Sequence, residues 1–245
     1  MDVPTIVLVH GAGHTATAWD QTRAELRHPS IAVDLPGRRG RPADIAAVTI
    51  DAAADSICSD VEVLAPDGDV VVVAHSAGGV VVPAVAARLA PRVQHLVFVA
   101  GLCAPEGATV VDSLNPDRSA AVVAQAHELR RRYRGHMFLP DRVDDWLAID
   151  DPKVANSIDG VNLITQPVSW RGVPATLPRT FVRARRDRIQ PRAMQDRLIA
   201  NCAASQVVDI DTGHTPALAA PRQLAGILDE IAGTAAGQDS SGGIS

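Results

Sequence analysis

The residues that could do chemistry are a serine, an aspartate and a histidine that lie far apart in the chain. Ser76 directly follows the apolar run Val70–Ala74, and a helical stretch begins immediately after it. A strand that turns so tightly into a helix leaves the serine hydroxyl at the helix N-terminus, where developing negative charge is favoured. Ser76 is therefore a candidate nucleophile. The alternative is an ordinary serine N-cap on a buried helix.

A candidate base for this serine is His214, in the sequence Asp211-Thr-Gly-His-Thr-Pro216. It falls in the loop after the last predicted strand. Histidine is the side chain best poised to take a hydroxyl proton near neutral pH. Because the chain has eight histidines, a solvated loop histidine is the alternative.

Asp187, which follows another predicted strand, is the candidate third member. A buried carboxylate would fix the tautomer of the histidine and stabilise its protonated form. Asp209 and Asp211 compete for this role but lie close in sequence to His214, and the loop after residue 100 has no carboxylate before Glu106. We therefore expect a triad of the serine, Asp187 and the histidine. A surface aspartate paired with neighbouring arginines is the alternative.

A glycine-rich loop, His10-Gly11-Ala12-Gly13-His14, follows the apolar run Thr5–Val9. Acyl transfer needs backbone N–H donors aimed at the oxyanion, and small residues let the backbone approach a substrate. We predict the N–H groups of Ala12 and Ala77 as the oxyanion hole, although a plain turn would look similar. The glycines lack the spacing of a dinucleotide-binding loop, and the chain has no P-loop.

Apolar runs alternate with helical stretches along most of the chain, which predicts right-handed crossovers and a mostly parallel sheet of the α/β class. The predicted strands are Thr5–Val9, Ile31–Asp34, Val70–Ala74, Val93–Ala100, Arg179–Ala184 and Gln206–Ile210. The predicted helices are Ala18–Leu26, Asp51–Leu64, Ala77–Leu89, Pro191–Asn201 and Pro221–Ala232.

One region, after the third long strand, breaks this alternation and lacks buried strand runs. We interpret it as a helical cap inserted over the strand ends. The Gly/Ser-rich end of the chain is typical of disorder. The predicted division is a core of residues 1–103 and 174–235, a cap of residues 104–173 and a disordered tail of residues 236–245.

Nearly the whole chain, roughly Pro4–Ala232, resembles the α/β-hydrolase superfamily. Within it the chain is most similar to the branch that holds plant salicylate methyl esterase, hydroxynitrile lyases and many small bacterial hydrolases. Ala74 stands where the usual Gly-x-Ser-x-Gly pattern has its first glycine. The resemblance implies the Ser76–Asp187–His214 triad and the cap. The matching segments are Val7–His14 with Trp19, Asp34–Gly37, Ala74–Gly79, and Gly213–Leu218 with Pro221.

The resemblance also bears on the reaction. Lyases of this branch carry a threonine where this chain has Gly11, and a lysine near the catalytic histidine, whereas Lys153 is the only lysine here. We therefore expect hydrolysis of a small-molecule carboxylic ester through an acyl-enzyme on Ser76. The alternatives are a thioesterase, a lyase or cyclase of secondary metabolism, and a non-catalytic small-molecule receptor.

Six residues are candidates for contact with the substrate. Three lie in the loops around the predicted triad and three in the predicted cap, where packing within the cap is an equal alternative. They are Gly11, His14, His75, Met137, Phe138 and Trp146.

The composition of the chain limits the kinds of binding partner that we expect. A net charge of −5 leaves no broad basic field for nucleic acid. The scattered Cys58, Cys103 and Cys202 match neither a metal site nor a disulfide framework. We expect no metal ion and no cofactor. No apolar run is long enough for a membrane span and no signal peptide is evident, so we expect a cytoplasmic protein without membrane contact. The resemblance alone makes a homodimer an expectation.

Overall fold

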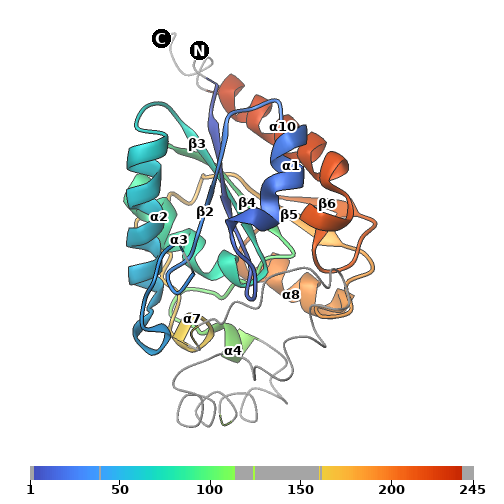
Figure 1. The fold of residues 1–245 in the computed structure, drawn as a ribbon. Helices are drawn as coiled ribbons and strands as arrows, with labels where there is room; N and C mark the ends of the chain where they lie inside the picture. The colour runs from blue at the N-terminus through green and yellow to red at the C-terminus, as the bar shows by residue number, and fades with distance from the viewer. Residues whose placement is uncertain (1–2, 39, 114–123, 125–159, 161, 239–245) are drawn as a thin grey trace.

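The computed structural model describes residues 3–38, 40–113, 124, 160 and 162–238, and its centre is a six-stranded sheet (Figure 1). The strand order is β2-β1-β3-β4-β5-β6, and each neighbouring pair is parallel. The predicted parallel α/β sheet is therefore confirmed. The strands are β1 (Thr5–Val9), β2 (Ser30–Val33), β3 (Val70–His75), β4 (Val93–Val99), β5 (Arg179–Ala184) and β6 (Gln206–Ile210).

Helices cover both faces of the sheet (Figure 1), with α2 and α3 on one face and α1 and α10 on the other. Side chains of α8 belong to the same core cluster as those of α2 and α3. The α-helices are α1 (Asp20–Glu25), α2 (Ile50–Leu64), α3 (Val82–Leu89), α4 (Val110–Ser113), α7 (Asn162–Thr165), α8 (Arg192–Asn201), α9 (Pro216–Ala219) and α10 (Pro221–Gln238). The 3₁₀ helices are η1 (Ala16–Trp19), η2 (Ile45–Ala47) and η3 (Ser76–Val81).

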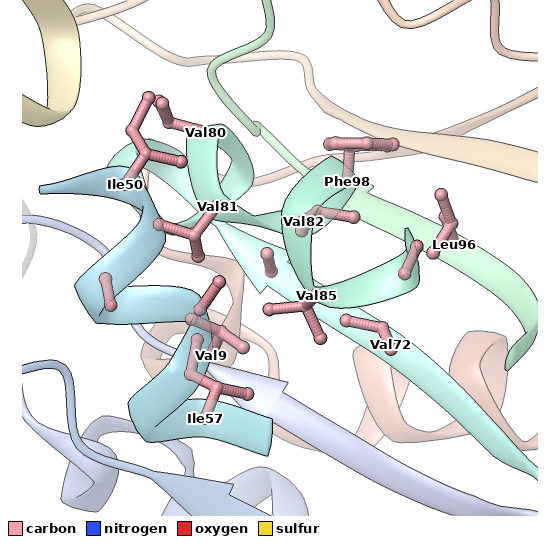
Figure 2. Close-up of a cluster of buried hydrophobic side chains, with 14 of the residues drawn as sticks. Val9, Ile50, Ile57, Val72, Val80, Val81, Val82, Val85, Leu96 and Phe98 are labelled. Atoms are coloured by element: carbon pink, nitrogen blue, oxygen red, sulfur yellow. The ribbon is translucent and has the colours of Figure 1, made fainter. Parts of the chain in front are cut away.

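The two helical layers explain why the strands are continuous apolar runs. Alternate residues of a strand point to opposite faces, so Val72 and Ala74 enter one core cluster while Val71 and Val73 enter the other. Figure 2 shows the first cluster, in which Val85 of α3 and Phe98 of β4 lie with Val72. Because both faces are buried, a strand such as β3 needs apolar side chains at every position.

The direction in which the chain crosses the sheet reverses between β1 and β3. From β1 the chain crosses to β2 on one side and later returns to β3 on the other. The loops that follow β1 and β3 therefore run in opposite directions from the carboxyl ends of these two strands. Open parallel sheets bind ligands at such a point. The elements α4 and α7 lie at this end of the sheet in Figure 1.

The segment after β3 differs from the continuous helix predicted over residues 77–89. It begins as η3 and becomes α-helical only from Val82. Two consecutive glycines and three valines are poor α-helix formers. Pro83 lies in the first turn of α3, where a proline is tolerated.

The predicted tail begins too early, because α10 continues to Gln238 and includes residues 236–238. At the two described ends of the predicted cap, Val110, Leu163 and Val168 are buried in the same cluster as Phe98. The domain division itself stays a prediction. Among the helices of the described ranges, none combines the length and the apolar character that a membrane crossing requires.

The end of α8 gives a first prediction. Ala203 has a positive φ of 50°, its N–H donates to the Ala200 carbonyl, and the Ala204 N–H donates to that of Ile199. This is a Schellman motif, in which glycine is favoured at the left-handed position. We expect Ala203→Gly to raise the free energy of unfolding by about 1 kcal/mol, as measured by urea denaturation. Ala200→Gly, inside the helix, is the matched control and should lower it; a loss in both variants would contradict the prediction.

A buried histidine gives a second prediction. His95 Nε2 donates to Thr180 Oγ1 at 2.8 Å, and that hydroxyl donates to Gln206 Oε1 at 3.1 Å. Burial lowers the pKa of His95 to about 4. Between pH 6.5 and pH 4 the unfolded chain therefore binds more protons, and stability falls on acidification.

His95→Gln keeps an N–H donor without a titrating group. In urea denaturation between pH 7 and pH 4.5, the wild type should lose stability relative to this variant as the pH falls. Parallel stability profiles of the two proteins would show that His95 does not carry this dependence.

Candidate active site

Ser76 stands at a sharp turn between the end of β3 and the start of η3. Its φ is 47°, which is rare for a residue with a side chain and marks local strain. This is the strand–turn–helix geometry expected of a nucleophile elbow.

The turn is possible because small residues flank the serine. A β-carbon added at Gly78 would lie 2.5 Å from the His10 carbonyl oxygen, so this backbone presses directly against the end of β1. Ala74 is fully buried between Val9 of β1 and Phe98 of β4. A methyl group therefore fits where the usual pattern has its first glycine.

The structure brings the predicted serine, histidine and aspartate together in one hydrogen-bonded chain. His214, in the loop between β6 and α9, has its Nε2 at 2.9 Å from Ser76 Oγ. Its other ring nitrogen, Nδ1, lies 2.6 Å from Asp187 Oδ2. Because a carboxylate accepts, Nδ1 carries the proton, and Nε2 is left to accept from the serine hydroxyl.

Asp187 is held by the loop after β5. Its Oδ1 accepts hydrogen bonds from the backbone N–H groups of Ile189 and Gln190, each at 2.8 Å. Its side chain is fully buried, so it is not the exposed aspartate of the alternative interpretation. One carboxylate oxygen is thus anchored to the backbone while the other faces the histidine.

The competing aspartates lie outside this chain of contacts. Asp209 pairs with Arg183 at 2.6 Å, and this ion pair lowers the pKa of Asp209. Asp211 pairs with Arg186 at 3.3 Å on the surface. The loop after β5, and not the end of β6, supplies the carboxylate.

The glycine-rich loop lies against Ser76. A β-carbon added at Gly11 would lie 2.9 Å from Ser76 Cβ and 2.7 Å from His75 Nδ1. The N–H of Ala77 is in the first turn of η3, where N–H groups have no partner within the helix. Both peptides predicted for the oxyanion hole are therefore close to the serine, and their role stays a prediction.

The side chain of His75 holds the loop that carries His214. Its Nε2 donates to the His214 carbonyl oxygen at 2.8 Å. Burial, then the neighbouring His214 and His14, lower the pKa of His75 well below its ordinary value. His14 packs edge-on against this ring, and its Nδ1 donates to the Ala12 carbonyl at 2.8 Å. Contact of Gly11, His14 or His75 with a substrate stays a prediction.

His10, the first residue of the glycine-rich loop, was not among the predicted site residues; it is fully buried, and its ring contacts the backbone of Gly11 and of Leu35, just beyond β2. Its position beside the first glycine of the loop was the available signal. Met137, Phe138 and Trp146 lie outside the described residues. Within the described part of the chain, no three His, Cys, Asp or Glu side chains are grouped as a metal ion would require.

This chain is similar to a curated esterase over about half of its length. A carbendazim hydrolyzing esterase from Nocardioides sp. (strain SG-4G) is 32% identical over 129 residues, which cover 49% of this chain and 53% of that protein. The matched part thus spans about half the length of this curated relative.

Two solved structures share the fold. An extracellular α/β-hydrolase from a Paenibacillus species, described as homologous in structure and function to tobacco salicylic acid binding protein 2, has a TM-score of 0.77 at 17% identity, covering 93% of this chain and 98% of that one. A methylesterase from Arabidopsis has a TM-score of 0.71 at 19% identity, covering 95% and 100%.

The predicted resemblance to the α/β-hydrolase superfamily is confirmed by the family model. The model of the alpha/beta hydrolase family matches residues 6–227, which include β1 from its second residue, the other five strands, and the loops that carry Ser76, Asp187 and His214. The chain belongs to the alpha/beta hydrolase family.

Proposed function

We propose that this protein is a serine hydrolase that cleaves a carboxylic ester of a small molecule through an acyl-enzyme on Ser76. The observation that carries the proposal is the hydrogen-bonded chain from Ser76 Oγ through His214 to Asp187, with contacts of 2.9 Å and 2.6 Å. A serine becomes a useful nucleophile when a base accepts its proton and a third group orients that base.

In the first half of the proposed reaction, Ser76 Oγ attacks the ester carbonyl carbon while its proton passes to His214 Nε2. The carbonyl oxygen becomes an oxyanion, which accepts hydrogen bonds from the N–H groups of Ala12 and Ala77. The carbon–oxygen bond to the alcohol then breaks, and His214 returns the proton to the departing oxygen. The acyl group remains on Ser76.

In the second half, His214 takes a proton from water, whose oxygen attacks the acyl carbon. The bond to Ser76 Oγ breaks and the serine recovers its proton, which releases the carboxylic acid. The Asp187 carboxylate stabilises His214 while it is protonated in both halves.

Two observations favour ester hydrolysis over a lyase reaction. The Nocardioides relative is described as an esterase and the Arabidopsis structure as a methylesterase. In addition, a threonine at position 11, as in the lyases of the related branch, would place its β-carbon 2.7 Å from His75 Nδ1. The present packing around Ser76 leaves no room for such a side chain.

The first test of this proposal is the variant Ser76→Ala. We expect a fluorophosphonate to add once to the wild type and not to the variant, as measured by intact-mass spectrometry. We also expect the wild type to hydrolyse p-nitrophenyl esters or carbendazim, with kcat reduced by about a millionfold in the variant.

The other candidate functions predict different results in the same assay. Faster turnover of thioesters than of matched oxygen esters would identify a thioesterase. Labelling without turnover would favour a receptor, or a lyase or cyclase. Equal turnover by the wild type and Ser76→Ala would rule out the proposed mechanism.

The second test addresses the carboxylate. Asp187→Asn removes the acceptor that fixes the His214 tautomer, so we expect kcat to fall by about ten-thousandfold. Asp211→Asn, on the surface nearby, is the matched control and should retain wild-type kcat. If the two variants lost activity equally, Asp187 would not be the partner of His214.

A further inference from the structure

His10 is a buried histidine whose two ring nitrogens both meet backbone groups. Its Nδ1 lies 2.8 Å from the Gly11 carbonyl oxygen, and its Nε2 lies 3.1 Å from the Leu35 backbone nitrogen. A carbonyl can only accept and a backbone N–H can only donate. The proton is therefore on Nδ1, and Nε2 accepts.

The surroundings keep His10 neutral. Burial, then the charge of Arg38, lower the pKa of His10 well below its ordinary value. The Asp34 carboxylate is 3.7 Å from Nε2 and is engaged by the Ala16 N–H at 2.7 Å. A second proton on the ring would also place an Nε2–H donor opposite the Leu35 N–H donor, and this repulsion disfavours the charged ring.

The carbonyl that His10 contacts belongs to the peptide whose other end is the Ala12 N–H. The two groups of a planar trans peptide point in opposite directions. The Gly11 oxygen accepts from His10 Nδ1 at 2.8 Å and from the His14 backbone N–H at 3.3 Å. Fixing this oxygen fixes the direction of the Ala12 N–H.

We propose that His10 is a positioning residue that aims the Ala12 N–H at the oxyanion, by way of the Gly11 carbonyl. The inference rests on the proposed serine-hydrolase function. The loop is at the right place, because a β-carbon at Gly11 would lie 2.9 Å from Ser76 Cβ. His10 contacts no reacting atom. Its two hydrogen bonds connect the backbone of Leu35, beyond the end of β2, to the peptide that carries the Ala12 N–H.

Two substitutions separate the two hydrogen bonds of His10. In His10→Asn the amide nitrogen takes the place of Nδ1 and keeps the donor to Gly11. In His10→Gln the amide oxygen takes the place of Nε2 and keeps the acceptor for Leu35. Oxyanion donors act on the transition state, so we expect His10→Gln to lower kcat by about 10- to 100-fold with KM nearly unchanged.

His10→Asn should retain about tenfold more kcat than His10→Gln. Fluorophosphonate labelling of Ser76 should slow in parallel with kcat, because the phosphonyl oxygen occupies the same hole. The control is the variant His95→Gln. His95 is a buried histidine at the other end of the sheet, so this variant should have a lower free energy of unfolding but an unchanged kcat. Urea denaturation of all variants supplies the stability scale.

The outcomes are distinct. If kcat follows the loss of unfolding free energy across the variants, or if His10→Gln retains kcat, His10 is merely structural and the inference is wrong. If the wild type is neither labelled nor active, like Ser76→Ala, the proposed function itself fails.

A measurement on the wild type covers the case in which a His10 variant does not fold. In ¹⁵N NMR of histidine-labelled protein between pH 5 and pH 9, His10 should carry its proton on Nδ1 throughout. A proton on Nε2 would leave no donor facing Gly11 and would overturn the proposal.

Discussion

The close contact between the turn at Ser76 and the end of β1 is the constraint on which the site depends. Gly78 lies so near the His10 carbonyl that no side chain fits between the two backbones. This contact places the glycine-rich loop beside the serine. Ser76 follows one strand, while the candidate oxyanion donors come from this loop and from the first turn of η3.

The packing and pairing of β3 in the sheet stabilise this strained turn. A residue such as Ser76 at a positive φ costs about 1–3 kcal/mol and persists only where the surroundings over-determine it. Here β3 is buried at every position and pairs with β1 and β4 on its two sides. Apolar packing on both faces, part of which Figure 2 shows, fixes the strand end from which the serine departs.

Of the buried histidines near the turn, His10, His75 and His214 have different partners, and these partners separate their chemistry. His10 and His75 each donate to a main-chain carbonyl, and burial holds the pKa of both well below its ordinary value. Both are suited to act as neutral braces. Only His214 has a carboxylate on one ring nitrogen and a hydroxyl on the other. That arrangement suits a group that must gain and lose a proton.

The parallel sheet and the residues that meet at the carboxyl ends of its strands were predictable from residue patterns, because continuous valine runs and the turn at Ser76 have few other solutions. Sequence order favoured Asp187 over Asp211, whereas the contact itself depends on the packed fold, which buries the Asp187 carboxylate against His214 and leaves Asp211 on the surface. The hydrogen bond from the Leu35 N–H to His10 was not predictable. It joins a side chain to a backbone group 25 residues away, which a residue pattern does not encode and only the packed fold brings within reach.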